Sequence, residues 1–464
     1  MGYLFGALLA IVAFFSGVVA ESRKIMFNRS VTPLEWTQVG IAHEKQNGAI
    51  NIALQQQNLH VLEAEFWAVS NPKHEKYGKF LTNKEIQSIV AAPAGRRDQV
   101  VAWLNSAGIS LDQIQSYEDA ILVRAPIGLL NALLQTKFYN FVNEKGKIIS
   151  RQMGDWSIPE EFGDIIQFIS GVSDFPIPRR GVKSRSFGLI QQEFYVVPET
   201  INSVYNIAGC TASNVTSQAA AEFQSDASYN QADLTSFYKQ MNITTAPISH
   251  IIGPYSGAFP DTEATLDVQY LTSIGIGANN WYWTEENWMY DFASSFARAE
   301  KIPDVVSISW GWSETAQCTI DKDCSTLGID SRAYVNRTNV EFQKIGLRGT
   351  TLLASSGDSG ANGRTGSCTD KILHPIFPAG SPYVTAVGAT EIIKPKFNLK
   401  YAPPICAQYP CASGGVEAAV SFKLSRFTSG GGLGCGRITN SAATPTRSAA
   451  APGRSAAKRS TVFR

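Results

Sequence analysis

The stretch Leu352–Gly363 reads LLASSGDSGANG, a short apolar run that ends in a polar, glycine-rich loop. Further apolar runs of this kind are APISHIIG (246–253), VVSISWG (305–311) and YVTAVGA (383–389). Helical patterns lie between them, EATLDVQYLTSIG (263–275) and RAYVNRTNVEFQKIGLRG (332–349). This alternation predicts a parallel α/β sheet from about residue 186 onward. In such sheets the chemistry lies in loops beyond the carboxyl ends of the strands, so SWGW (309–312) and SSGDSGANG (355–363) are candidate site loops.

The region before residue 186 has a different character. Residues 21 to about 185 contain no cysteine and mix helical with strand periodicities, which is typical of a small α+β domain. The region ends in PIPRRGVKSRS (176–186), a turn-prone basic linker and a plausible processing site. We therefore expect an N-terminal domain over 21–185 that is separable from the α/β domain.

Composition excludes some classes of partner. The 464 residues are 44% apolar and 17% charged, with a net charge of +1, so neither nucleic acid nor an anionic membrane surface is indicated. Residues 1–20 are apolar and end in small residues, which predicts a cleaved secretory signal; a membrane anchor is the alternative. Because no other apolar stretch is long enough to cross a bilayer, we expect a protein of the secretory pathway without a membrane anchor. Four N-x-S/T sequons agree with this route, at Asn28, Asn214, Asn242 and Asn336.

Seven cysteines fit the same oxidising compartment. CTIDKDC (318–324) and CAQYPC (406–411) predict two short disulfide-closed loops. A zinc site is less favoured, since histidines are missing near the cysteines, and we expect no metal site from residues of this chain. The odd count leaves one cysteine without a partner.

The Gly-Asp-Ser-Gly sequence around Ser359 suggests a trypsin-like nucleophile, but its context argues against that reading. Trypsin-like chemistry needs a histidine base held by a buried aspartate. Three of the five histidines precede the α/β region, and the remaining two, His250 and His374, are more commonly structural in such positions. The α/β pattern also differs from the all-β fold of trypsin-like enzymes.

Two carboxylates offer different chemistry. Glu263 and Asp267 are four residues apart, so on a helix they share one face. Glu263 has a structural explanation, because Asp261 would cap the helix and a first-turn glutamate suits the helix dipole. Asp267 has no such explanation. Two carboxylates on a largely buried helix repel each other, so one must hold a proton or the two must share one. At this point a structural and a functional role remain equally open.

Several motifs together resemble the sedolisin family, the serine-carboxyl peptidases, and in particular its lysosomal tripeptidyl-peptidases. EATLDVQYL (263–271) and LLASSGDSGA (352–361) carry the resemblance, with FPAGSPYVTAVGAT (377–390) and FTSGGG (427–432) further along. PKHEKYGKFLTNKEI (72–86) resembles the activation-domain motif of the family. The resemblance runs from about residue 30 to Gly432.

The resemblance implies a subtilisin-like parallel sheet with flanking helices, preceded by an α+β activation (pro) domain. It implies that Glu263 is the base for a nucleophilic serine, that Asp267 orients Glu263, and that Asp358 donates to the oxyanion. A carboxylate base and a protonated donor both suit acid pH. Implied partners are polypeptide substrates, cleaved to release tripeptides from free N-termini, and the chain's own propeptide. A lysosomal or secreted location and a calcium ion are also implied.

The sequence departs from the family after FTSGGG. The family's nucleophile lies in a Ser-Gly-Thr-Ser segment with calcium ligands further on, and neither is present here. Residues 436–464 carry six basic residues and no acidic ones, which predicts a disordered tail. We therefore expect a catalytic domain over 186–433 that is incomplete through truncation or a frame-shift, an anomalous tail over 434–464, and a chain inactive for lack of the serine. The alternative is a non-enzymatic relative whose activation domain binds and inhibits an intact homologue.

Overall fold

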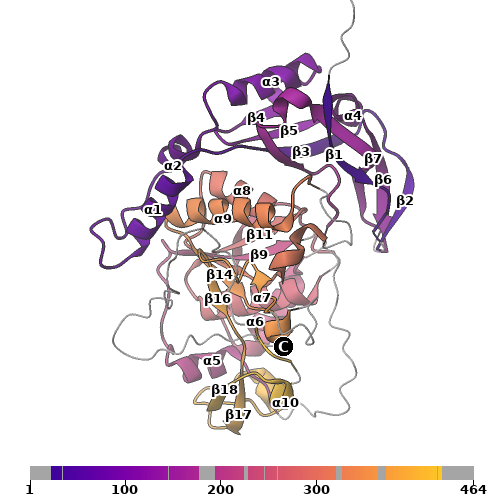
Figure 1. Cartoon of the computed structure of the whole chain (residues 1–464). Helices are drawn as coiled ribbons and strands as arrows, with labels where there is room; N and C mark the ends of the chain where they lie inside the picture. The colour runs from indigo at the N-terminus through magenta and orange to yellow at the C-terminus, as the bar shows by residue number, and fades with distance from the viewer. Residues whose placement is uncertain are drawn as a thin grey trace, which may run out of the picture.

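The computed structural model describes residues 22–33, 35–144, 146–176, 194–223, 228–244, 246–258, 260–319, 327–363, 373–425 and 427–430. The predicted signal peptide, nearly all of the basic linker and the predicted tail lie outside the described residues. The described chain forms two parts, the N-terminal unit (22–176) and the C-terminal unit (194–430), shown in Figure 1. Among these residues, none of the helices has both the length and the apolar composition needed to span a membrane.

The N-terminal unit is an α+β structure. Its elements, in chain order, are β1 (Arg23–Arg29), β2 (Trp36–Ile41), β3 (Asn47–Leu54), α1 (Leu59–Ser70), α2 (Asn83–Val90), α3 (Arg96–Ser106), η1 (Leu111–Gln113), β4 (Ile114–Ser116), β5 (Ala120–Pro126), α4 (Ile127–Leu134), β6 (Lys137–Asn143), β7 (Ile148–Pro159), η2 (Glu160–Phe162) and β8 (Ile166–Ser170).

Two antiparallel sheets organise this unit, with strand orders β1-β7-β6-β2 and β4-β5-β3-β8. Buried side chains of β3, such as Ile52 and Leu54, pack in one cluster with Val100 and Leu104 of α3. The motif Pro72–Ile86 ends in a helix start, because Thr82 and Glu85 form a reciprocal capping box at α2. The expected α+β structure is confirmed.

The C-terminal unit alternates strands and helices. Its elements are α5 (Pro198–Tyr205), β9 (Ser217–Phe223), α6 (Gln231–Met241), β10 (Ile248–Ile252), α7 (Thr262–Ile274), β11 (Asn279–Glu285), α8 (Met289–Arg298), β12 (Val305–Ile308), β13 (Trp312–Ser313), η3 (Glu314–Thr319), α9 (Ser331–Leu347), β14 (Thr351–Ser355), η4 (Gly360–Asn362), β15 (Ile376–Phe377), β16 (Thr385–Val387), β17 (Thr390–Lys396), η5 (Pro404–Ala407), β18 (Gly414–Ala419) and α10 (Phe422–Ser425).

Six parallel strands form the central sheet, in the order β10-β11-β9-β12-β14-β16. The predicted parallel α/β sheet is therefore confirmed, and the four predicted strands correspond to β10, β12, β14 and β16. The two helical patterns became α7 and α9. Strands β9 and β11 were not predicted from the sequence, and both are interior strands of the sheet.

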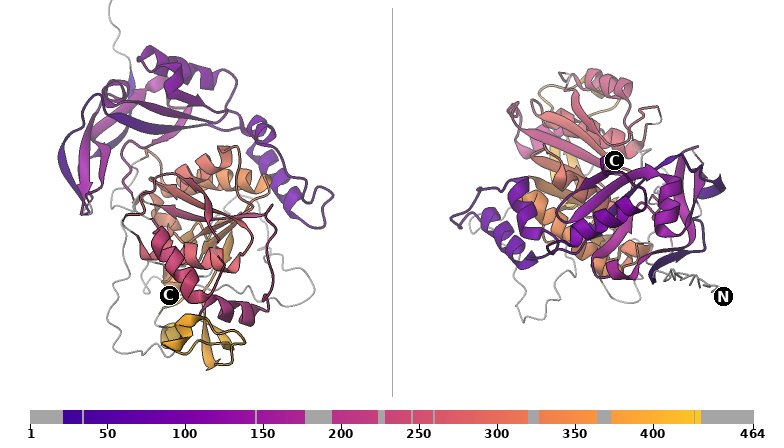
Figure 2. Two further views of the ribbon diagram at one scale, coloured as in Figure 1. Left: turned by 180° about the vertical axis from the view of Figure 1, so that it is seen from behind. Right: turned by 90° about the horizontal axis from the view of Figure 1, so that it is seen from above.

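Helices cover both faces of the sheet. Alternate residues of β9 point to opposite sides, so Ala219 and Ala221 pack in the cluster of α8 and α9, whereas Ala220 packs in the cluster of α6 and α7. Small alanines let helices approach this strand closely on both sides. The two helix layers are visible in Figures 1 and 2.

The N-terminal unit lies over helices α8 and α9 of the C-terminal unit (Figures 1 and 2). At one end, Phe66 of α1 packs with Val340 and Leu347 of α9, and its ring meets Tyr383 edge-on at 5.1 Å. Leu81 donates its backbone N–H to the Leu347 carbonyl at 2.8 Å.

A buried charge cluster makes a second contact between the units. Lys344 Nζ lies 2.8 Å from Asp119 Oδ2 and 2.5 Å from Glu341 Oε2, and Arg337 lies 3.4 Å from the same aspartate oxygen. All four side chains are at most 1% exposed. Asp119 is the one contribution of the N-terminal unit to these ion pairs, and the two cations hold the pKa of its carboxyl well below its usual range despite burial.

Candidate active site

Helix α7 carries the two carboxylates singled out from the sequence. Asp261 caps the helix, and its Oδ1 accepts the Glu263 backbone N–H at 2.9 Å. Glu263 is half-buried in the first turn, and Asp267 lies one turn further on. Ala264 and Val268 of the same helix are buried against the sheet, which fixes the orientation of α7.

Asp267 faces polar groups from the middle of the sheet. It shares hydrogen bonds with Ser309, which follows β12, and with Glu222 near the end of β9. Burial raises the pKa of Asp267 to about 6, and these hydrogen bonds limit the rise. A carboxyl–carboxyl hydrogen bond requires a proton between the two groups, so Asp267 and Glu222 form an acid pair.

Glu222 was not among the site residues predicted from the sequence. It is fully buried on the central strand β9, where Trp310 donates its indole N–H to Oε2 at 2.7 Å. The signal available in the sequence was a glutamate at the end of the otherwise small and apolar run AAAEF (219–223). An acidic side chain inside a central strand is rarely tolerated without a partner. Trp310 belongs to the SWGW loop, so that expected site loop does contact the carboxyl group.

A cavity of ≈ 270 Å³ opens beside Asp267. Helix α7 contributes Leu266 and Tyr270 to its wall, which also includes Ser307 of β12, Ser309 just after that strand, and Ser355 of β14. The cavity therefore lies between α7 and the ends of β12 and β14. It is large enough for several side-chain groups and provides space next to the acid pair.

Asp358 and Ser359 lie in the loop after β14. Asp358 is half-buried and Ser359 is exposed. The loop is tied to a segment far along the chain, because Gly360 donates its N–H to the Thr428 carbonyl at 2.8 Å and Gly430 donates to the Ser356 carbonyl at 3.2 Å. Two of the quoted motifs, LLASSGDSGA and FTSGGG, thus lie side by side.

Three polar residues of the candidate site lie at the carboxyl ends of neighbouring parallel strands. The adjacent strands β9, β12 and β14 carry Glu222, Ser309 and Asp358, respectively, at or just beyond their carboxyl ends. Parallel sheets have their functional sites at this end of the strands. His250 lies elsewhere, on the edge strand β10, with its ring stacked on Trp281 at 4.0 Å.

The remaining predicted sites are the cysteine loops, the sequons and the metal site. Cys406 and Cys411 form the expected disulfide. Cys324 of the other predicted loop lies outside the described residues, and Cys210 is an exposed free thiol. The sequon asparagines Asn28, Asn214, Asn242 and Asn336 are all exposed. In the described ranges, no three potential metal ligands of the His, Cys, Asp or Glu type come together, so these residues do not fit the implied calcium ion.

Comparison with known proteins decides the family. The Pro-kumamolisin activation domain model matches residues 34–175. Physarolisin of Physarum polycephalum is 38% identical over 408 residues, covering 86% of this chain and 70% of its own length. This chain belongs to the sedolisin family of peptidases. The family match makes the N-terminal unit its activation domain, so the chain has the organisation of a peptidase precursor.

More distant sedolisins follow. Tripeptidyl-peptidase 1 of Homo sapiens is 28% identical over 386 residues, covering 79% of this chain and 66% of that protein. The chain thus spans about two thirds of the length of these curated relatives. Among solved structures, a Pseudomonas sedolisin, a serine-carboxyl proteinase complexed with pseudo-iodotyrostatin, is 17% identical with a TM-score of 0.33, covering 44% of this chain and 55% of that one.

Proposed function

We propose that this sedolisin is the precursor of an acid-acting serine-carboxyl peptidase, and that its substrates are polypeptides with free N-termini from which it releases tripeptides. The pairing of Asp267 with Glu222 is the observation that supports the acid mechanism. The tripeptide specificity rests on the similarity to tripeptidyl-peptidase 1. By the same similarity, we propose a secretory route with a signal peptide, glycans on the four exposed asparagines, and a lysosomal or secreted location.

The proposed reaction uses the side chains in defined roles. Glu263 accepts the proton of a serine hydroxyl as its Oγ attacks the substrate carbonyl carbon. Asp267 orients Glu263, and its link to Glu222 lets it hold or pass on a proton. A protonated Asp358 donates a hydrogen bond to the oxyanion. The C–N bond then breaks as Glu263 returns the proton to the leaving amine, and water hydrolyses the acyl-enzyme by the same proton path.

The 464 residues contain no Ser-Gly-Thr-Ser segment, so we propose that this chain does not complete the reaction by itself. The calcium ion of the family would likewise be held by residues beyond those present here. A full-length version that includes the serine segment should cleave, and should process itself at acid pH within about residues 179–190.

The test is tripeptide release from a peptide with a free N-terminus at pH 4, assayed for the 464-residue chain, for the full-length version, and for its Glu263→Gln variant. We expect activity only in the full-length version with Glu263 intact. Turnover by the 464-residue chain, or full activity of the Glu263→Gln variant, would contradict the proposal.

A second candidate function is a non-enzymatic inhibitor of an intact homologue. The observation that favours it is the buried contact made by Asp119, which gives the N-terminal unit a charge-specific docking group. Inhibition of an intact homologue by the 464-residue chain, lost in Asp119→Ala, would support this alternative.

A further inference from the structure

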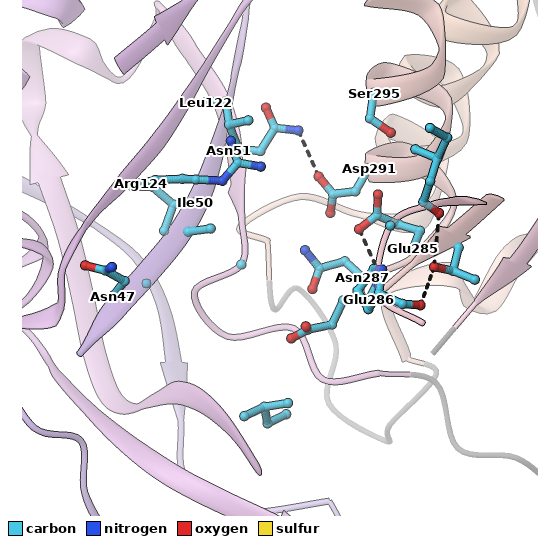
Figure 3. A pocket seen from close by; sticks show the side chains of 18 of the residues that line it. Asn47, Ile50, Asn51, Leu122, Arg124, Glu285, Glu286, Asn287, Asp291 and Ser295 are labelled. Carbon is cyan, nitrogen blue, oxygen red and sulfur yellow. Dashed lines mark hydrogen bonds between the residues drawn. The ribbon is translucent and has the colours of Figure 1, made fainter. Parts of the chain in front are cut away.

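A second group of carboxyls lies between the two units, away from the candidate active site. Asp291 of α8 is only 7% exposed. Its Oδ1 accepts the Asn51 amide at 2.8 Å and the Ser170 hydroxyl at 2.7 Å, both from the N-terminal unit. Figure 3 shows Asp291 pointing toward Asn51, with the carboxyl of Glu285 beside it. Docking of the N-terminal unit therefore encloses a carboxyl of the C-terminal unit.

Other charged groups face Asp291 from every element around it. Glu285 interacts repulsively with Asp291 and with Glu286, and Asp174, which follows β8, is a second acidic neighbour of Asp291. The nearby cation Arg151 of β7 is directed elsewhere, to the Asp174 carbonyl, to Asn287 at 2.8 Å and to Glu286 at 3.6 Å. The surrounding cavity, drawn in Figure 3, is also lined by Arg124, His250, Arg298, Glu300 and Lys301. Within the part of the chain that the structure describes, no ion pair joins Asp291 to a cation.

Enclosure and the acidic neighbours favour the protonated forms. Burial and then the Asp174 charge raise the pKa of Asp291 to about 6, against the hydrogen bonds from Asn51, Ser170 and Asn287. Burial and the Asp291 charge likewise raise the pKa of Glu285, although Glu286 donates its backbone N–H at 2.9 Å. The open cavity of ≈ 1200 Å³ beside them gives water access, so protons can exchange without separation of the units.

We propose that docking of the N-terminal unit onto the C-terminal unit takes up protons at Asp291 and Glu285, so that this contact tightens as the pH falls. The sign follows from linkage. A carboxyl whose pKa is raised in the docked state stabilises docking fully below its ordinary pKa, and this stabilisation is lost as the pH rises through the raised value. The pKa of Asp291 is raised to about 6 and that of Glu285 to about 8, so the window runs from about pH 4 to about pH 8.

The charge cluster at Asp119 has the opposite sign but acts outside this window. Its depressed pKa means that its stabilisation is lost only in stronger acid. Between pH 5 and pH 7 the carboxyls of Asp291 and Glu285 therefore set the pH dependence of docking. The biological role of this pH dependence rests on the proposed function. In acid the activation domain stays docked while the linker is cut, and it is released by the cleavage or by a later rise in pH.

Hydrogen exchange of the full chain tests the proposal without substrate. A Glu263→Gln background ensures that cleavage of the linker does not contribute to the result. Protection of the peptides that cover β3 and α8 is measured from pH 4.5 to pH 7.5 and divided by the intrinsic exchange rate. We expect protection to fall with rising pH, by up to about tenfold per pH unit for each proton released.

Two variants remove the titrating groups while keeping their shape. Asp291→Asn and Glu285→Gln should each flatten this slope, and Asp291→Asn should protect β3 more than the parent does at pH 7.5. Glu300→Gln, a neutralised carboxyl at the exposed rim, should keep the parental slope. Asp119→Asn should lower protection at every pH but keep the slope.

Protection that stays constant or increases as the pH rises would overturn the proposal, as would a parental slope in both neutralised variants. If Asp291→Asn does not fold, Glu285→Gln alone decides. Because exchange needs no catalysis, a failure of the proposed peptidase activity would leave this result unchanged and distinguishable.

Discussion

Glu222 of strand β9 and Asp267 of helix α7 are joined by a hydrogen bond between their carboxyl groups. The strand places Glu222 at full burial, and the helix brings Asp267 to it across the layer between sheet and helix. Such a pair is stable only while it holds a proton. The stability of the C-terminal unit should therefore depend on pH.

We predict that Asp267→Asn flattens this dependence. The pKa of Asp267 is raised to about 6, so the protein loses stability as the pH rises through 6. At pH 7.5 the variant should be more stable than the parent by up to about 3 kcal/mol, as a shift of two pKa units implies. Urea unfolding at pH 4.5 and 7.5 measures this. Asp261→Asn, which retains a good helix cap, is the control and should keep the parental pH slope; a parental slope in Asp267→Asn would refute the assignment.

Removal of Asp119 should destabilise the docked protein strongly. Asp119→Ala leaves Lys344 and Arg337 buried without their carboxylate from the N-terminal unit, a change that typically costs about 3–5 kcal/mol. Asp98→Ala breaks an exposed pair with Arg97 and should cost less than about 1 kcal/mol. Urea unfolding at pH 7 compares the two. Equal effects would mean that the cluster contributes no more than a surface ion pair.

Phe66 should anchor helix α1 to the C-terminal unit. It is 7% exposed and packs against Tyr383 and α9, so Phe66→Ala should cost about 3–5 kcal/mol and loosen α1 in hydrogen exchange. Tyr77, 55% exposed in the same region, provides the control: Tyr77→Ala should change stability by about 0.5 kcal/mol or less. If α1 exchanges at the parental rate in Phe66→Ala, the helix is held by other contacts.

Gly430 should be required for the position of the Asp358 loop. A Cβ at residue 430 would lie 2.2 Å from the Ser356 carbonyl oxygen, so Gly430→Ala must push the loop and the Phe427–Gly430 segment apart. Faster exchange of residues 356–360 is the expected result. Gly388→Ala meets Ser429 at a milder 3.3 Å and should disturb the loop less. The reverse order of the two variants would contradict the close approach.

Local patterns in the sequence were sufficient for much of the fold. The periodicity of EATLDVQYLTSIG and the cap at Asp261 predicted α7 to within a residue or two, because capping and amphipathicity are encoded locally. β9 and β11 were missed. The run SQAAAEF has low β-propensity by composition, and it becomes a central strand only because helices need small residues on both of its faces.

The candidate site likewise contains residues that local sequence patterns predicted and residues that depend on tertiary packing. Glu263 and Asp267 could be paired from their spacing, since one helix carries both. Glu222 could not, because the hydrogen bond to Asp267 depends on how α7 packs over β9. The contacts of Asp119 and Asp291 across the two units likewise depend on docking, for which a single sequence carries no local signal.

The charged side chains of α9 at the contact with the N-terminal unit are suited to two environments, a buried protein interface and water. In the precursor, these side chains are buried and form ion pairs with one another and with Asp119; they are Arg337, Glu341 and Lys344. Once the activation domain is removed, the same helix face meets water, where three charged groups are readily hydrated. Leucines at these positions could also hold the two units together, but after removal of the activation domain they would form an exposed apolar patch that is prone to aggregation. A helix that must be first interior and then exterior is thus built from residues acceptable in both places.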